Sequence, residues 1–367
     1  MQTKYNKVKQ AIRSQILDGT FVPHQKISSE NELMKEFGVS RHTIRVAIGE
    51  LVNEGWLYRE QGAGTFCADR SLQDVKNHDQ KNIAIMTTYI SDYIFPEIIR
   101  GAESYLSSLG YQVSLFSTNN NLDNEKRVLE NILTQGVDGL IIEPTKSAFS
   151  NPNINYYLNL ERSNIPYIMV NAFYDELEPL CIMMDDEKGG FIQTEHLIEK
   201  GHRTILGFFQ TDDMQGVKRM KGYIKAHRVH QIPINPKHMI TYYSEEKKTK
   251  PIQELKNLLG NQEDKPTAIV GYNDELVLQL LDVLREQKIQ VPRDMSIVGY
   301  DSSSLAQVSE VKLSSIHHPK HVMGETAAKM IVDLIREKHA TSKKEKTELD
   351  SVIYEPELII RQSTKAL

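Results

Sequence analysis

Cysteine is nearly absent from this chain of 367 residues, which contains two, Cys67 and Cys181. Two cysteines cannot build a disulfide framework or a zinc cluster, and this scarcity is typical of proteins in a reducing cytosol. The sequence also lacks any run of 18 apolar residues, so no segment is predicted to span a membrane. It begins without the apolar stretch of a secretion signal, and we therefore expect a cytoplasmic protein with no membrane partner.

A strong charge of either sign is missing as well. The net charge of −5 gives no indication of nucleic-acid binding, but the charge is unevenly shared. Residues 1–70 carry ten basic and eight acidic side chains, whereas the other 297 residues carry 34 and 41. Because the chain is also too long for one ordinary domain, we expect a mildly basic head followed by a larger acidic body.

The signatures of common enzymes are missing too. No GxGxxG motif or Walker loop follows the first strand-like run of the body, no serine nucleophile elbow appears, and no pattern for a Schiff-base lysine is present. His317, His318 and His321 lie close together, but no second cluster of metal ligands accompanies them. We therefore expect neither catalysis nor a metal or other cofactor.

Residues 1–70 carry the pattern of a winged helix-turn-helix domain. Apolar residues spaced by four predict a helix over 4–17, Ser29 and Glu32 form a capping box that opens a second helix, and Ser40 caps a third helix that continues to about residue 53. In a helix-turn-helix, the start of the last helix enters the major groove of DNA. Two strand-like runs around a glycine-rich turn at 61–64 follow and predict the wing.

The motifs at residues 29–33, 37–45 and 62–66 occur in an order that resembles the DNA-binding head of the GntR family. The resemblance covers about residues 3–70 and implies binding to double-stranded operator DNA. It places Arg41, Thr43 and Arg45 on bases or phosphates, and arginine can pair with guanine through two hydrogen bonds. Isolated arginines could equally form a solvated helix face, but the ordered motifs favour contact. The further residues implied are Lys4, Tyr5, Glu30, His42, Gln61, Gly62 and Gly64, and for His42 a solvated position is an equal alternative.

Residues 71–82 contain few apolar side chains without periodicity, which predicts a linker. Over residues 83–367, short apolar runs alternate with segments of helical period, which predicts an α/β fold with parallel sheets. This length suits two similar lobes with a cleft between them. The expected strands are 83–86, 139–142, 167–170, 182–184, 205–209, 268–270 and 296–299, with residues 315–318 following the last one.

Polar and aromatic residues recur just after these strands, where ligands of parallel sheets bind. Carboxylates, amides and guanidinium groups hydrogen-bond sugar hydroxyls, and aromatic rings cover the C–H face of a sugar. Aspartate and asparagine also form ordinary turns in such positions, but their recurrence after successive strands favours a binding site.

The body also carries a family pattern, because residues 138–142, 197–202, 219–222, 272–275 and 291–301 resemble the effector-binding body of the LacI/GalR family. The resemblance covers about residues 83–363 and implies a two-lobed clamshell like that of type I periplasmic binding proteins. It implies that Arg219, Asn273 and Asp301 hold sugar hydroxyls. The other residues expected in the site are Tyr89, Tyr93, Glu143, Asn171 and His318.

LacI-family proteins carry their own helix-turn-helix and hinge helix, and this sequence has a GntR-type head instead. That combination, together with residues 87–96, 143–147 and 215–220, resembles the arabinose-responsive repressors, which implies L-arabinose as the effector. The residues alone indicate only a small sugar or polyol. We expect a homodimer that represses transcription and leaves its operator when sugar binds. A response to another pentose or hexose, a solute-binding protein without catalytic activity and an enzyme with a regulatory head are the alternatives.

Overall fold

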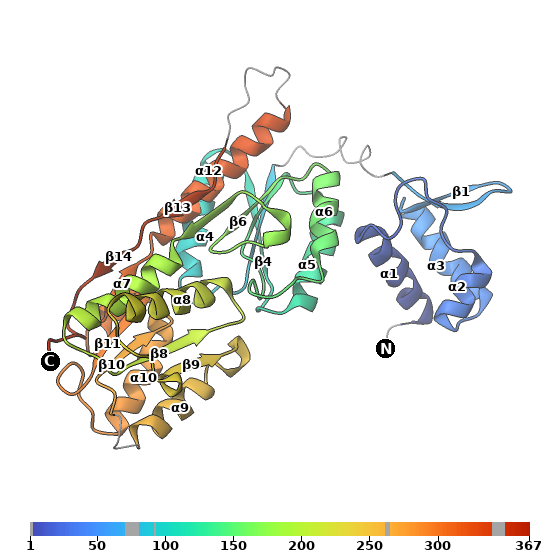
Figure 1. Ribbon diagram of the computed structural model, residues 1–367. Helices are drawn as coiled ribbons and strands as arrows, with labels where there is room; N and C mark the ends of the chain where they lie inside the picture. The colour runs from blue at the N-terminus through green and yellow to red at the C-terminus, as the bar shows by residue number, and fades with distance from the viewer. Residues whose placement is uncertain (1–2, 70–80, 92, 261–264, 340–348) are drawn as a thin grey trace.

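Figure 1 shows the computed structural model of the chain, in which the described residues are 3–69, 81–91, 93–260, 265–339 and 349–367. A small N-terminal head lies beside a larger body, and the body has two lobes, each built around its own sheet. The predicted linker falls mostly on residues 70–80, outside the described part of the chain, and its last residue, Asn82, already belongs to the first strand of the body.

Local sequence explains where the helices of the head begin and end. Ser29 accepts a hydrogen bond from the amide of Glu32, whose carboxylate accepts from the amide of Ser29, so the predicted capping box is present. Gly38 ends the same helix with a φ of 61°, a left-handed conformation that glycine adopts without strain. Ser40 caps the next helix by accepting from the amide of Thr43. The elements of the head are α1 (Lys4–Leu17), α2 (Glu30–Phe37), α3 (Arg41–Asn53), β1 (Leu57–Glu60) and β2 (Gly64–Cys67).

The apolar faces of these helices form the core of the head. Val8 and Ile12 of α1 and Ile44 and Leu51 of α3 are each at most 1% exposed and belong to one buried cluster. Strands β1 and β2 pair antiparallel as the predicted wing. Burial of the spaced apolar residues leaves the opposite face of α3, with its arginines, turned to solvent.

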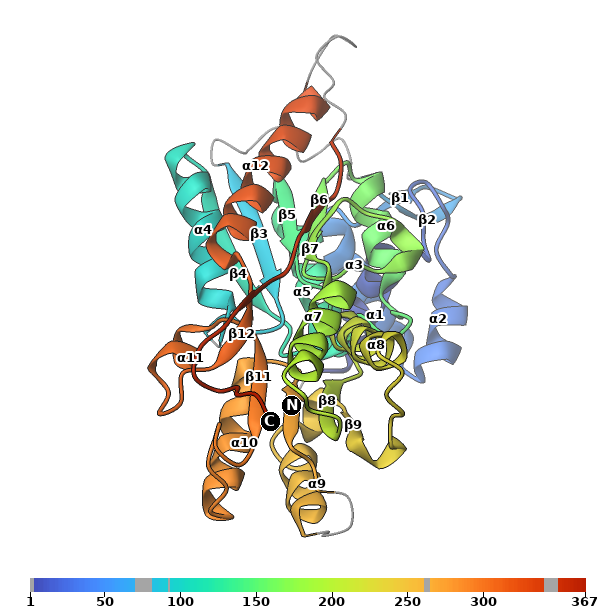
Figure 2. The ribbon, with the colours of Figure 1, turned by 60° about the vertical axis from the view of Figure 1, so that its left-hand side comes forward.

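The N-terminal lobe contains a parallel sheet in the order β13-β7-β6-β5-β3-β4. Side chains alternate between its faces, so that Ile83 and Ile85 pack with α4 and α12, whereas Ala84 and Met86 pack with α5 and α6. Figure 2 shows α4 and α12 together on one side of this sheet. The strands are β3 (Asn82–Thr87), β4 (Gln112–Ser117), β5 (Gly139–Ile142), β6 (Tyr167–Val170), β7 (Cys181–Met184) and β13 (Val352–Tyr354), and the helices are α4 (Phe95–Ser108), α5 (Leu122–Gln135), α6 (Ile154–Arg162) and α12 (Lys320–His339).

The C-terminal lobe repeats this plan with the strand order β14-β12-β11-β10-β8-β9, in which only the β12–β14 pair is antiparallel among the strands described. Helices α7 and α8 pack together on one face, and α9 and α10 cover the other. The strands are β8 (Ile205–Gln210), β9 (Met239–Tyr242), β10 (Ala268–Gly271), β11 (Ser296–Asp301), β12 (Ser314–His317) and β14 (Glu357–Ile359). The helices are α7 (Asp186–Glu199), α8 (Met214–Val229), α9 (Lys250–Leu259), α10 (Asp274–Glu286) and α11 (Ser304–Val308), and the short 3₁₀ turns are η3 (Pro236–His238) and η4 (Ser244–Glu246). A further 3₁₀ turn, η2 (Asp175–Leu177), lies between β6 and β7 of the N-terminal lobe.

The described chain crosses between the lobes after β7, after β12 and after β13. Such crossings form a hinge about which two rigid lobes can close. The predicted fold class, a two-lobed α/β clamshell with a winged helix-turn-helix head, is confirmed.

Several elements escaped prediction. All seven expected strands are present, but β4, β9, β13 and β14 were not predicted, and residues 315–318, expected to follow the last strand, lie mostly within β12. Strands β4 and β9 are edge strands, and partial exposure of their side chains blurs the apolar signal. The segments of helical period expected in the body were 95–109, 123–135, 187–200, 216–229, 251–259, 274–287 and 319–338, and they did not include α6 and α11. Helix α11 has only five residues, too few to show a helical period.

Candidate functional site

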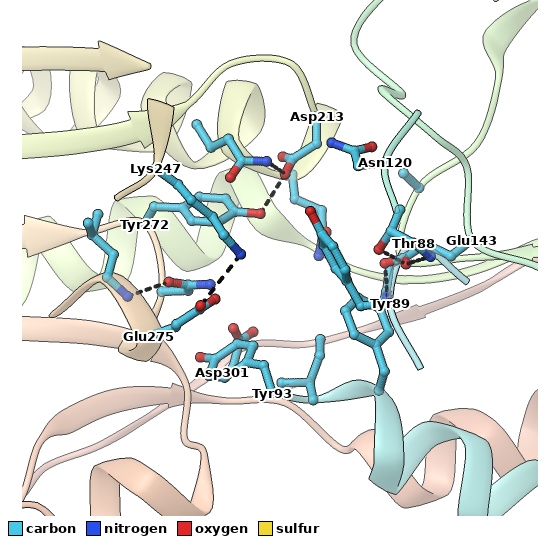
Figure 3. Close-up of a pocket in the computed structure, with 18 of the residues that line it drawn as sticks. Thr88, Tyr89, Tyr93, Asn120, Glu143, Asp213, Lys247, Tyr272, Glu275 and Asp301 are labelled. Atoms are coloured by element: carbon cyan, nitrogen blue, oxygen red, sulfur yellow. Dashed lines mark hydrogen bonds and ion pairs between the residues drawn. The ribbon is translucent and has the colours of Figure 1, made fainter. Parts of the chain in front are cut away.

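A pocket lies between the lobes, at the carboxyl ends of both sheets (Figure 3). It encloses about 900 Å³ of empty space, part of it open to solvent at the mouth. The lining combines aromatic rings with carboxylates, amides and a guanidinium group. Its residues are Thr88, Tyr89, Tyr93, Ile94, Phe95, Asn120, Glu143, Pro144, Ser147, Asn171, Ala172, Gln210, Asp213, Gln215, Arg219, Tyr242, Lys247, Tyr272, Asn273, Glu275, Leu276, Gln279 and Asp301.

The wall from the N-terminal lobe centres on Glu143, which follows β5 and is 6% exposed. Its carboxylate accepts from the amide of Thr88 at 3.0 Å, from the hydroxyl of Thr88 at 2.5 Å and from the side-chain amide of Asn171 at 3.0 Å. Burial raises the pKa of Glu143 above its ordinary value, against these hydrogen bonds. The buried Oδ1 of Asn171 has no hydrogen-bond partner among the described residues, so it is an acceptor available to a ligand.

The wall from the C-terminal lobe centres on Arg219 of α8, which is 1% exposed. Its Nε donates to Asp186 at 2.8 Å, its Nη1 donates to the carbonyl oxygen of Tyr272 at 2.8 Å, and its Nη2 lies 3.8 Å from a carboxylate oxygen of Asp301. The guanidinium carbon lies 3.5 Å from the centre of the Tyr300 ring. These contacts fix the orientation of the planar guanidinium group of Arg219, which suits it to recognise two adjacent hydroxyl groups.

His318 lies behind this wall. Its Nδ1 is 3.1 Å from the carboxylate of Asp301, its side chain is fully buried, and it does not line the pocket. Burial disfavours a charge on Asp301, but the hydrogen bond from His318 and the charge of Arg219 hold its pKa below the ordinary value. His318 was predicted in the lining, and the structure instead places it where it orients Asp301.

Asp213 adds a carboxylate that the sequence analysis did not single out. One of its oxygens accepts from the hydroxyl of Tyr272 at 2.5 Å and from the amide of Gln210 at 2.9 Å, and the other caps α8 by accepting from the amide of Gly216. Burial raises the pKa of Asp213 to about 7. Asp213 follows the end of β8 by three residues, so the rule that ligands bind just after parallel strands applies to it as well.

Side chains of the two lobes touch across the cleft. The hydroxyl of Tyr93 donates to the carbonyl oxygen of Tyr300 and accepts from the amide of Asp274, each at 3.0 Å. Asn120 donates to Ser244 at 3.0 Å, and Lys146 forms an ion pair with Glu245. Lys247 lies 5.0 Å from the centre of the Tyr89 ring, also across the cleft. These contacts define a closed arrangement of the lobes.

Seven of the eight predicted effector residues line this one pocket: Tyr89, Tyr93, Glu143, Asn171, Arg219, Asn273 and Asp301. Among the lining residues that the sequence did not predict, Lys247 follows β9, a strand that was not predicted either. Asn120 comes after β4, which was missed as well, so these two omissions have the same cause. Within the described residues, no three His, Cys, Asp or Glu side chains gather as a metal site.

The predicted DNA-contacting face of the head contains a network of its own. Arg45 donates from Nε to both carboxylate oxygens of Glu30 at 3.0 Å, and Arg41 donates to Asn31 at 2.6 Å. The side chains of Arg41 and Arg45 are 53% and 61% exposed. Glu30 therefore orients Arg45 while leaving most of its side chain accessible to a ligand.

The remaining predicted contact residues surround this network. Lys4, His42, Gln61 and Gly62 are exposed, whereas Tyr5 is partly buried against the core of the head. Gly62 and Gly64 have φ angles of 79° and 133° and allow the tight turn of the wing. In Figure 1, α2, α3 and the wing lie farther from the body than α1 does.

These features together define a class of protein: a ligand-responsive transcription regulator with a winged helix-turn-helix head and a clamshell body. Residues 4–67 match the bacterial regulatory proteins of the gntR family, and residues 194–364 match the periplasmic binding protein-like domain. No helix among the described residues is long and apolar enough to cross a membrane.

Two relatives specify the family. The chain is 59% identical over 366 residues to an arabinose metabolism transcriptional repressor of Halalkalibacterium halodurans, covering 99% of this chain and 97% of that protein. It is 48% identical to an arabinose metabolism transcriptional repressor of Geobacillus stearothermophilus, covering 99% of this chain and 98% of that protein. The chain therefore belongs to the family of arabinose metabolism transcriptional repressors. It is a regulator and not an enzyme.

Solved structures show the same fold. A LacI-family regulator of Enterococcus faecium with bound ribose is 27% identical, with a TM-score of 0.65, over 78% of this chain and all of that one. The regulator CelR in complex with cellobiose is 22% identical, with a TM-score of 0.67, over 99% of this chain and all of that one. At 22% identity, the similarity to CelR shows a shared fold and nothing further.

Proposed function

We propose that this repressor binds the operators of L-arabinose utilisation genes and leaves them when L-arabinose occupies the pocket between its lobes. The observation that carries this proposal is the pairing of two polar walls, one from each lobe, around a single cleft. Glu143 and Asn171 present acceptors from one lobe, and Arg219 and Asp301 present a donor and an acceptor from the other. The names of the two full-length relatives support arabinose as the sugar.

The composition of the pocket suits a small sugar. The rings of Tyr89 and Tyr93 lie at the wall supplied by the N-terminal lobe and can cover the apolar face of a sugar ring (Figure 3). Because groups from both lobes must reach the same ligand, a sugar bound between them stabilises the closed arrangement. Release of DNA then requires that the sugar bind the closed state more tightly than the operator-bound state.

We further propose that the protein acts in the cytoplasm as a homodimer joined through its bodies. Large apolar side chains are exposed on helices of the body, with Leu305 at 47% and Val308 at 78% on α11 and Val322 at 51% on α12. A dimer presents two recognition helices to the two halves of a palindromic operator. Light scattering on the purified protein tests the dimer, and a mass of one chain contradicts it.

The direct test of function is an operator-release titration. A fluorescent operator is bound by the protein, and L-arabinose, D-xylose, D-ribose or D-galactose is added while anisotropy is followed. We expect L-arabinose to release the operator at the lowest concentration. Release by another sugar alone would replace arabinose as the effector, and retention of the operator with every sugar would contradict induction by a sugar of this kind.

A further inference from the structure

Helix α1 of the head lies against α5 and α6 of the N-terminal lobe (Figure 1). The hydroxyl of Ser14 on α1 donates to Glu130 on α5 at 2.7 Å, and the hydroxyl of Tyr156 on α6 donates to the same oxygen at 2.9 Å. The side-chain amide of Asn159 on α6 donates to the carbonyl oxygen of Leu17 at 2.6 Å. Leu17 is the last residue of α1, so a side chain of the body satisfies a carbonyl group that the helix itself leaves unpaired.

Apolar packing surrounds these hydrogen bonds. Tyr156 is 3% exposed, and it belongs to the same buried cluster as Ile12 and Leu17 of the head. Ile16 packs against this cluster from α1. Burial also raises the pKa of the Tyr156 hydroxyl. The hydrogen bonds of Ser14, Glu130 and Asn159 are partly buried, which makes them stronger than at an open surface. We call this contact surface of α5 and α6 the seat of the head.

A chain of buried hydrogen bonds connects this seat with the sugar pocket. Thr145, two residues after Glu143 of the pocket, donates from its amide to the hydroxyl of Tyr174 at 2.7 Å. Tyr174 donates to Glu125 of α5 at 2.6 Å, and Tyr157 of α6 donates to the same oxygen at 2.8 Å.

The last link of this chain is next to the head. Glu125 and Tyr157 are both fully buried, and Tyr157 is adjacent in sequence to Tyr156, which contacts Glu130 and Ser14. This chain of contacts offers a route by which a shift of the segment that carries Glu143 can reach α6, because its groups are too closely packed to move independently.

The seat leaves the recognition helix uncovered, because Arg41 and Arg45 remain 53% and 61% exposed in the docked head. Docking thus acts on the orientation of the head rather than by masking its arginines. Two heads of a dimer must reach half-sites at a fixed helical spacing, so orientation alone can prevent operator binding. In this structure the head is docked while the lobes are closed, with Asn120 bonded to Ser244 across the cleft.

From these observations we propose that the face formed by Glu130 of α5 and Tyr156 and Asn159 of α6 is the docking site of the chain's own DNA-binding head, and that the head occupies it in the sugar-bound state. The assignment to the sugar-bound state rests on the proposed function. Sugar binding and head docking then stabilise each other, while operator binding requires the head to leave its seat.

The test uses Asn159→Asp in the full-length protein. This change replaces the donor to Leu17 by a carboxylate that repels the carbonyl oxygen. Asn164→Asp adds the same charge at an exposed residue just beyond α6 and is the matched control. Hydrogen–deuterium exchange with saturating L-arabinose should show faster exchange at residues 10–21 in Asn159→Asp than in the wild type and the control.

The second measurement is operator release by L-arabinose. Without sugar, all three proteins should bind the operator equally. Asn159→Asp should need about fivefold more sugar for half release, the lower end of ordinary allosteric coupling. Ser14→Ala, which removes the donor to Glu130 from the head side, should shift release in the same direction, and it replaces Asn159→Asp if that variant does not fold.

Three results would overturn the proposal. Unchanged exchange at residues 10–21 in both variants means that the head does not dock. Faster exchange with an unchanged sugar requirement means that docking is not coupled to the pocket. Weaker operator binding without sugar means that docking supports, rather than opposes, DNA binding. If the wild type does not respond to any sugar, the proposed function is refuted, and so is the proposal that the head docks in the sugar-bound state. Hydrogen–deuterium exchange of the sugar-free proteins then still decides whether the head docks at all.

Discussion

Arg219 offers the sharpest test of the sugar site, provided that the substitution is chosen for its surroundings. Replacement by alanine leaves Asp186 and Asp301 buried without their cation, which destabilises a protein by about 3–5 kcal/mol. Such a loss is a large part of the about 5–15 kcal/mol of a typical fold. Arg219→Lys keeps the charge and removes the planar group that bonds Asp186 and Tyr272 and stacks on Tyr300.

The expected effect of Arg219→Lys follows from these contacts. Loss of one charge-assisted hydrogen bond to a sugar hydroxyl weakens binding by about 1.5–3 kcal/mol, which is a factor of about 10 to 150 in the dissociation constant. Operator binding without sugar should be unchanged, because α8 lies in the C-terminal lobe, away from the head.

Isothermal titration calorimetry with L-arabinose measures this loss, and a thermal melt establishes that the variant is folded. Arg228→Lys, at an exposed position of the same helix, is the matched control and should bind sugar as the wild type does. A folded Arg219→Lys protein with wild-type sugar affinity would refute the role of this guanidinium in the site.

Three further predictions concern the head, the pH dependence and the packing. Arg45→Ala should weaken operator binding by about 1–3 kcal/mol and binding to random DNA by less, as measured by anisotropy; equal losses would indicate a phosphate contact. Asp213 has a pKa of about 7 in the folded chain, above its ordinary 3.8, so the folded state binds a proton more tightly and loses stability as pH rises from about 4 to 7. Asp213→Asn, which retains the helix cap, should flatten this decline in melting temperature, and an unchanged slope would contradict it. Gly324→Ala places a Cβ 1.9 Å from the carbonyl oxygen of Ile98, so α4 and α12 must separate; urea denaturation should show a loss of about 1–3 kcal/mol, and wild-type stability would refute this close contact.

The head was predictable almost entirely from its sequence because its determinants are local. Ser29 and Ser40 each cap a helix by accepting from an amide three residues later in the chain, and Gly38 ends a helix through its own φ angle. The spacing of apolar residues on α3 decides which face is buried. The pairing of Arg45 with Glu30 was not predictable, because it joins α3 to α2 and no local sequence pattern determines the angle at which two helices pack.

The sugar pocket was predictable in outline and incomplete in detail. The rule that ligands bind after parallel strands, together with the resemblance to the LacI/GalR family, located seven lining residues. The rule failed where a strand itself was missed, as for Lys247 after β9. The residue type and sequence position of His318 are those expected of a sugar-binding residue. In the folded chain, however, His318 lies behind Asp301 and hydrogen-bonds its carboxylate instead of reaching the pocket.

By itself, the sequence determined the order of the domains, the winged helix-turn-helix and the α/β alternation, because caps, turns and periodicity act within a few residues. Only the tertiary structure decided that Glu143 and Arg219 face one cleft and that Asn159 caps the last turn of α1, 142 residues earlier in the chain. Such contacts depend on how lobes and head pack as whole bodies. Burial then determines how strong these contacts are, because a charge or hydroxyl removed from water must be stabilised by the few hydrogen-bond partners that the fold places beside it.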